Sequence, residues 1–178
     1  YCDGPNPIFP DLIGENVYLN MINQAYDYLY ITTPYLILDD NLQTALINAA
    51  KRGVDVRIIT PGIPDKKIVF RVTRSYYQTL IKHGIRIYEY TPGFIHAKCF
   101  ASDDKVATVG TINMDYRSLY LHFENGVWFY KNKVIQDILS DFQETLNYCD
   151  PISIDFCRNR NIVIRAFQSI LRLFAPLL

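Results

Sequence analysis

The spacing of apolar residues along the chain predicts helices that alternate with strands. In residues 14–28, apolar side chains recur every three or four positions, as on one face of a helix. The same spacing predicts further helices over residues 39–53, 66–83, 133–147 and 160–174. Short runs rich in β-branched and aromatic residues predict strands over 29–33, 54–60, 85–90, 95–101, 105–110 and 126–130. The aromatic run 126–130 is expected to be a buried strand.

Capping and turn residues mark the ends of several of these elements. Asp39 or Asp40 is a typical N-cap, and Gly53 and Gly84 are typical helix stops. The stretch "ASDDKV" predicts a hairpin turn with Asp103 at its tip. Helices alternating with strands, followed by a hairpin, predict an α/β domain in which helices flank a mixed β-sheet.

Composition narrows the class of protein. The chain has 178 residues, with 18 Lys and Arg against 18 Asp and Glu. This balance gives no long-range attraction for polyanions, so nucleic acid is not an expected partner and any anion site must be local. The sequence contains no run of about 18 apolar residues, so no membrane span is expected. It contains no C-x-x-C spacing, so no zinc site is expected. The opening "YCDGPNP" resembles the interior of a longer protein, so we expect residues 1–178 to be a single excised domain.

His96 and Lys98 form the first candidate for chemistry. If residues 95–101 form a strand, these two side chains share one face, whereas Ile95, Ala97 and Cys99 face the apolar layer. Two cationic or potentially cationic groups on one face repel unless an anion lies between them. The spacing therefore predicts a phosphate site, in which the charge of Lys98 favours a neutral, nucleophilic His96.

Residues downstream extend this candidate site. Asn113 follows a strand and a glycine, and its amide would donate to a phosphoryl oxygen. Glu124 would accept the other imidazole N–H of His96 and so fix its tautomer. A histidine, a lysine, an amide and a carboxylate together suit phosphodiester cleavage without a metal ion, in which the imidazole attacks phosphorus.

The full pattern is more specific than any of its parts, because it reads H-x-K, four residues, D, six residues and G-[ST]-x-N. The matching residues are His96, Lys98, Asp103, Gly110, Thr111 and Asn113. This pattern resembles the HKD motif of the phospholipase D superfamily. The stretches "TPYLILDDNLQTALINAAKRGVDVRIITPG", "RSYYQTLIKHGIRIYEYTPGFIHAK", "NMDYRSLYLHFENG" and "RLFAPLL" are similar to the C-terminal half of bacterial cardiolipin synthases, over nearly the whole chain.

This resemblance implies a reaction and a partner. Two HKD halves pack around one site, where one histidine forms a phosphohistidine and the other protonates the leaving alcohol. The partner would be the N-terminal half of the same chain or a second copy. A phosphatidyl group passes between anionic phosphatidylglycerol molecules, glycerol is released, and no metal or cofactor is required. The location implied is the bacterial inner membrane, with the anchors outside this chain.

The resemblance also implies a role for each matching residue. His96 would be the catalytic imidazole, with an acid/base role favoured over a nucleophilic one. Lys98, Asn113 and Thr111 would bind phosphate, with Thr111 standing where serine is usual. Glu124 would orient His96. Asp103, on the expected hairpin tip, is assigned a structural role first and a catalytic role second.

Two further features leave alternatives open. His122 stands where the family often has asparagine, and it would either perturb the site or fill space, with space-filling favoured. Residues 158–178 predict an amphipathic helix with basic residues along it, which would lie on an anionic membrane or pack on its own domain. His83, at the end of a predicted helix, is assigned no catalytic role.

Two rival functions fit the same sequence. A small homodimer that builds a whole site from two copies of His96 would be a phosphodiesterase or nuclease. The other rival is a half-domain that binds a phospholipid or a partner chain without catalysis. Such a binding module has no evident need for an imidazole oriented by a carboxylate.

Overall fold

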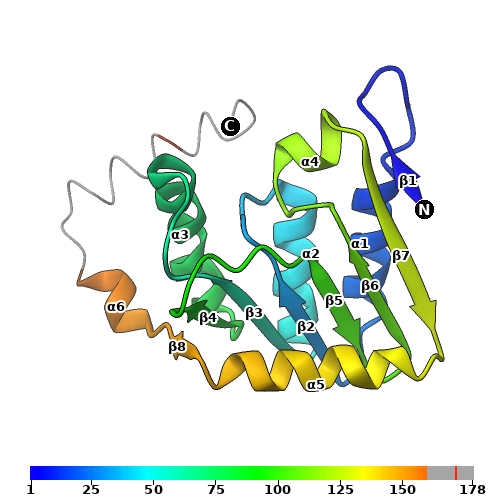
Figure 1. Ribbon diagram of the computed structural model, residues 1–178. Helices are drawn as coiled ribbons and strands as arrows, with labels where there is room; N and C mark the ends of the chain where they lie inside the picture. The colour runs from blue at the N-terminus through cyan, green and yellow to red at the C-terminus, as the bar shows by residue number, and fades with distance from the viewer. Residues whose placement is uncertain (160–170, 172–178) are drawn as a thin grey trace.

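A mixed sheet runs through the centre of the molecule (Figure 1). The computed structural model describes residues 1–159 and Leu171. In this part of the chain, eight strands follow the order β1-β7-β6-β5-β2-β3-β4-β8. They are β1 (Cys2–Asp3), β2 (Tyr28–Thr32), β3 (Asp55–Pro61), β4 (Arg86–Tyr90), β5 (Cys99–Ser102), β6 (Val106–Gly110), β7 (Glu124–Tyr130) and β8 (Cys149–Pro151).

The sheet is parallel in one part and antiparallel elsewhere. β2, β3 and β4 are parallel neighbours, and helices connect them, as parallel pairs require. β5, β6 and β7 form an antiparallel meander that joins the sheet beside β2. The short β1 and β8 pair antiparallel with β7 and β4. The predicted α/β fold with a mixed sheet flanked by helices is confirmed.

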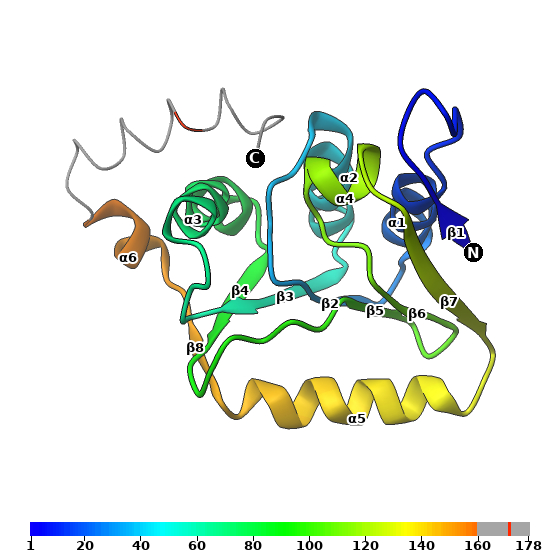
Figure 2. The ribbon, with the colours of Figure 1, turned by 45° about the horizontal axis from the view of Figure 1, so that its top comes forward.

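Helices cover both faces of this sheet, as Figure 2 shows. α5 crosses one face alone, and the other labelled helices lie on the opposite side. The helices are α1 (Ile13–Gln24), α2 (Asp40–Lys51), α3 (Lys67–Lys82), α4 (Tyr116–Tyr120), α5 (Val134–Leu146) and α6 (Ile154–Arg158). The main core lies under α1, α2 and α3, and a smaller one under α5 contains Ala101, Ala107 and Ile135. None of the helices described is long and apolar enough to cross a bilayer.

Local chemistry explains where the predicted helices begin and end. Asp39 is the N-cap of α2, and its carboxylate accepts the backbone N–H of Leu42 at 2.7 Å. Gly53 and Gly84 follow α2 and α3 with φ of +96° and +93°, which favours glycine. The expected helix over residues 160–174 and most of the amphipathic segment 158–178 lie outside the described residues.

The strand expected over residues 95–101 starts later than predicted, at Cys99. Its neighbour β2 ends at Thr32, which pairs with Cys99, and Pro34 has no N–H with which to continue the ladder. Residues 95–98 therefore form an extended loop. Ala97 is exposed rather than facing the apolar layer, and Lys98 is buried.

The expectation that residues 126–130 are buried is also wrong. Val127, Trp128 and Tyr130 are 54%, 40% and 60% exposed. α5 packs on β4, β5 and β6, whereas β7 is contacted by α1 and is paired with β1 only at its beginning. Most of β7 is therefore an open strand at the side of the sheet.

Candidate active site

A pocket of about 450 Å³ opens where three strands of the meander meet. β5 begins, β6 ends and β7 begins at this end of the sheet, because each is antiparallel to the next. Loop residues that flank these strand ends are thereby brought together. The pocket is lined by His96, Ala97, Lys98, Cys99, Val109, Gly110, Thr111, Asn113 and Glu124. Five of the predicted site residues thus share one pocket.

Lys98 is buried, whereas His96, two residues before it, is exposed. The lysine is only 7% exposed, and its Nζ donates to the backbone carbonyl of His96 at 2.7 Å. This bond uses one of the three ammonium hydrogens and leaves two for a ligand. The ring of Phe94 lies beside His96, with the ring centroids 5.6 Å apart. Sequence reasoning missed Phe94, although "FIH" places it two residues from the histidine.

Electrostatics favour a neutral His96. Burial lowers its pKa, and the charge of Lys98 lowers it further, against an opposing effect of Asp65. Burial also lowers the pKa of Lys98, whereas the carboxylates of Glu124 and Asp115 act to raise it. The pocket is therefore a place where the negative charge of a phosphate would be stabilised, and a bound phosphate would raise the pKa of both groups.

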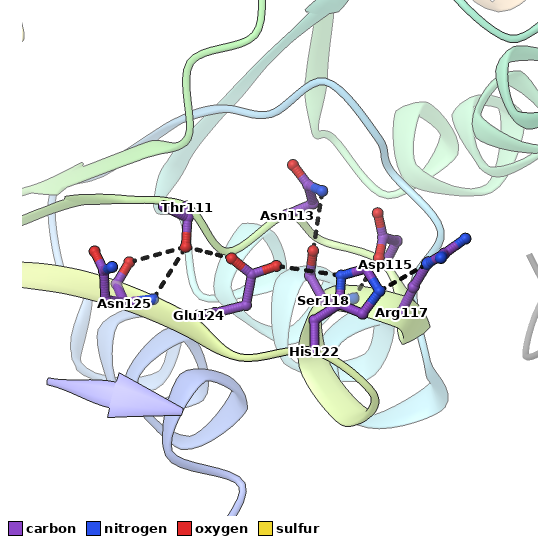
Figure 3. Close-up of polar contacts among 8 residues, drawn as sticks. All are labelled: Thr111, Asn113, Asp115, Arg117, Ser118, His122, Glu124 and Asn125. Carbon is purple, nitrogen blue, oxygen red and sulfur yellow. Dashed lines mark hydrogen bonds and ion pairs between the residues drawn. The ribbon is translucent and has the colours of Figure 1, made fainter. Parts of the chain in front are cut away.

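Asn113 lies on the loop between β6 and α4, and only one end of its side-chain amide is hydrogen-bonded. Its Nδ2 donates to Oγ of Ser118 at 2.9 Å, while its buried Oδ1 has no partner within the described residues (Figure 3). A buried unpaired amide oxygen is costly, which is typical of sites completed by a ligand. Rotation of the amide would let Ser118 donate to Oδ1 and would free Nδ2 for another acceptor.

Glu124 contacts Thr111 and His122 rather than His96. The Oγ1 of Thr111 donates to Glu124 Oε2 and accepts the backbone N–H of Asn125 at 3.0 Å. On the other side, Glu124 Oε1 lies 3.9 Å from Nδ1 of His122 (Figure 3). The predicted bond from His96 to Glu124 is not formed in this chain. The hydroxyl of Thr111 is engaged as well, so a phosphate contact would require it to turn away from Glu124.

His122 belongs to a chain of polar contacts with Arg117 and Glu124. The space-filling role that the sequence favours is therefore wrong. Arg117 Nε donates to His122 Nε2 at 2.8 Å, so the ring proton lies on Nδ1, on the side of Glu124. Asp115 begins α4, where its carboxylate accepts the backbone N–H of Ser118 at 2.7 Å. Burial raises the pKa of Asp115. The sequence signal for α4 is "DYRS", in which Asp115 is the N-cap. The helix that follows has only five residues, too few to show helical periodicity.

Asp103 lies at the other end of β5, away from His96. It has φ of +55° on the hairpin tip, and its carboxylate accepts the backbone N–H groups of Tyr26, Asp27 and Tyr28, each at 2.9 Å. These bonds tie the hairpin to the start of β2. These contacts support the structural role expected for Asp103. A direct catalytic role would require contact with the pocket around His96, which Asp103 does not line.

Comparisons with known proteins agree with this geometry. Residues 18–146 match the sequence profile of the family described as "Cardiolipin synthase, PLD-like domain". The chain belongs to the phospholipase D-like family. It is 49% identical over 173 residues to an uncharacterized protein of Streptococcus mutans, covering 97% of this chain and 38% of that protein. It is 41% identical over 166 residues to a cardiolipin synthase of Halalkalibacterium halodurans, covering 93% of this chain and 33% of that enzyme.

The fold is likewise that of a phospholipase D-like domain. A phospholipase D family member, Nuc from Salmonella typhimurium, superposes with a TM-score of 0.69 at 20% identity. That superposition covers 85% of this chain and 97% of Nuc. The chain therefore corresponds to nearly all of Nuc, while it spans between 33% and 38% of the curated relatives above. Among the described residues, no cluster of three or more His, Cys, Asp or Glu could hold a metal ion.

Proposed function

We propose that the chain is one half of a phosphatidyltransferase of the cardiolipin synthase type. The reaction would transfer a phosphatidyl group from one phosphatidylglycerol to another through a phosphohistidine and release glycerol. The observation that carries this proposal is the pocket that unites His96, Lys98 and Asn113, in a chain 41% identical to a cardiolipin synthase over 93% of its length.

The pocket supplies one imidazole, whereas the reaction uses two. One histidine attacks phosphorus, the bond from phosphorus to the glycerol oxygen breaks, and a second histidine gives that oxygen its proton. A hydroxyl of the second lipid then passes its proton back to this second histidine and attacks phosphorus, which breaks the phosphorus–nitrogen bond. A partner half, from the N-terminal part of a longer chain or from a second copy, would supply the other imidazole across the open pocket.

We assign His96 the acid/base role, and Lys98 and Asn113 the phosphate contacts. A neutral imidazole is the form that accepts a proton from the attacking hydroxyl, and the lowered pKa of His96 favours this form. To protonate the leaving glycerol, His96 must first be charged, and the negative phosphate of the substrate favours the charged form. Buried Lys98 supports the charge that develops on the phosphoryl oxygens without the cost of reorganising water.

The setting that fits this reaction is an anionic membrane surface. The donor and acceptor would both be anionic phospholipids, so the pocket has to reach head groups at a bilayer. For a cardiolipin synthase this would be the bacterial inner membrane, and the anchoring segments would lie outside this chain. Nucleic acid remains an unexpected partner.

A second candidate is a self-sufficient homodimeric phosphodiesterase. The observation that favours it is the match to Nuc, since this chain corresponds to 97% of that protein. Two copies of His96 related by a twofold axis would then complete one site. The balanced charge of the chain, with 18 basic and 18 acidic residues, fits a nuclease poorly.

The test uses the full-length protein with vesicles of phosphatidylglycerol. The proposal expects cardiolipin and glycerol in equal amounts, with chelator present. His96→Ala should abolish both products. His83→Ala is the matched control, because His83 caps α3 through Nδ1 and the carbonyl of Thr79 at 2.8 Å, outside the pocket. If His96→Ala left turnover intact, the pocket would not be the catalytic centre.

A further inference from the structure

A second cavity lies beside the phosphate pocket, and Asn113 lines both. It has a volume of about 270 Å³. The other polar side chains that line it belong to Tyr35, Lys66, Asp115, Arg117, Ser118 and His122. None of the catalytic roles proposed above uses Tyr35, Lys66 or Arg117, so these three residues of the cavity have no assigned function.

Two cations of this cavity are left without a carboxylate partner. Arg117 uses Nε to bond His122, which leaves its terminal guanidinium nitrogens for a ligand. Lys66 is exposed at the start of α3, and its Nζ lies 6.0 Å from the centre of the Tyr35 ring. Within residues 1–159 and Leu171, neither cation forms an ion pair. Two unpaired cations at one cavity favour an anionic ligand.

The carboxylates nearby are already engaged by the protein. Asp115 accepts the backbone N–H of Ser118 at the start of α4, and burial raises its pKa. Asp65 accepts the hydroxyl of Tyr35 at 2.5 Å. The hydroxyl of Ser118 is shared with the amide of Asn113, so Lys66 and Arg117 rather than Ser118 would supply donors to a ligand. The cavity therefore offers donors and positive charge to an incoming group.

A row of rings leads from this cavity to the catalytic imidazole. Tyr35 and Phe94 lie with their ring centroids 6.2 Å apart, and Phe94 and His96 follow at 5.6 Å. Lys66 lies over the far end of this row, against Tyr35. A ligand in the second cavity would thus lie next to a phosphate held at His96, with Asn113 between them.

We propose that this second cavity binds the phosphate of an anionic acceptor lipid, which rests on the transferase function proposed above. In cardiolipin, one glycerol joins two phosphates. An attacking phosphatidylglycerol must therefore hold its own phosphate one glycerol away from the phosphorus that its hydroxyl attacks. Lys66 and Arg117 would hold that phosphate and offset its repulsion from the phosphohistidine. They would thereby select a lipid acceptor over water or a small alcohol.

The experiment measures how one intermediate divides between two acceptors. The full-length protein acts on phosphatidylglycerol vesicles in the presence of ethanol, and both cardiolipin and phosphatidylethanol are quantified. Because both products arise from the same phosphohistidine, their ratio reports the choice of acceptor alone. Lys66→Ala and Arg117→Ala should each lower the ratio of cardiolipin to phosphatidylethanol at least tenfold, equivalent to about 1.4 kcal/mol.

Lys67→Ala is the matched control, because Lys67 is an exposed neighbour of Lys66 that lines neither cavity. It should leave the ratio unchanged. The proposal is overturned if Lys66→Ala keeps the wild-type ratio, or if Lys67→Ala lowers it equally, which would indicate general surface charge. If Arg117→Ala fails to fold, exposed Lys66 still decides the outcome. A wild-type protein that forms neither product would refute the transferase function itself, and the subsite with it.

Discussion

Asp103 offers a sharp test of which motif residues act through structure. In the HKD pattern it is part of the signature, yet its carboxylate binds three backbone N–H groups at the beginning of β2, at the far end of β5 from His96. We expect Asp103→Ala to lower the free energy of unfolding and to leave the chemistry of the folded protein largely intact.

The magnitude follows from the contacts that are lost. Net hydrogen bonds to a charged group contribute about 1.5–3 kcal/mol each, but Tyr26 and Asp27 are exposed and water would replace part of this, so about 1 kcal/mol each is reasonable. Alanine at φ of +55° adds about 1 kcal/mol of strain. The expected loss is therefore about 3–4 kcal/mol. Asp103→Asn keeps the left-handed preference and part of the bonding, so it should lose about half as much.

Urea unfolding of the 178-residue chain measures this loss. A loss of about 3–4 kcal/mol should lower the unfolding midpoint by roughly 1–2 M at an unchanged slope. Asp11→Ala, at an exposed loop position, is the control and should change the midpoint little. Activity per folded molecule is measured in the full-length protein. Unchanged stability together with abolished turnover would refute the structural role and restore a catalytic one.

Two further predictions concern buried charges. Lys98→Met should raise the pKa of His96 toward its ordinary value of 6.5, because the neighbouring cation is lost while burial remains. NMR titration of the imidazole measures this pKa. An unchanged or lower pKa would contradict the prediction. Glu89→Ala should lower the free energy of unfolding by about 2–4 kcal/mol, since the buried carboxylate binds Arg74 through two nitrogens and its loss leaves the guanidinium unpaired. A loss below about 1 kcal/mol in urea unfolding would show that the pair contributes little.

The long elements could be predicted because they repeat a pattern over many residues. α2 and α3 carry apolar positions at helical spacing, with a cap or a glycine at their ends. β1 and β8 have only two and three residues, so no periodicity reveals them. They exist because β7 and β4 offer them an edge, and this is a property of the assembled sheet. The late start of β5 has the same origin, since the end of β2 sets it.

The spacing of His96 and Lys98 located the pocket, although the reasoning about strand faces did not hold. The loop before β5 buries Lys98 and exposes His96. The partner of Glu124 could not be predicted, because it depends on the pairing of β6 with β7, where the N–H of Thr111 donates to the carbonyl of Asn125 at 2.9 Å. That contact places the hydroxyl of Thr111 beside the carboxylate. The second cavity could not be predicted from the sequence either, since its cations, Lys66 and Arg117, are 51 residues apart in the chain.

The central claim is that the pocket around His96 is half of a phosphoryl-transfer site. The most direct measurement is hydrolysis of a chromogenic phosphodiester by the purified 178-residue chain, alone and mixed with the N-terminal remainder of the full-length protein. Chelator is present, and the protein concentration is varied. The account predicts a folded chain that is inactive alone at every concentration, and activity upon mixing that His96→Ala abolishes. Activity of the chain alone that rises faster than linearly with concentration would contradict it, because a homodimer would then be the complete enzyme.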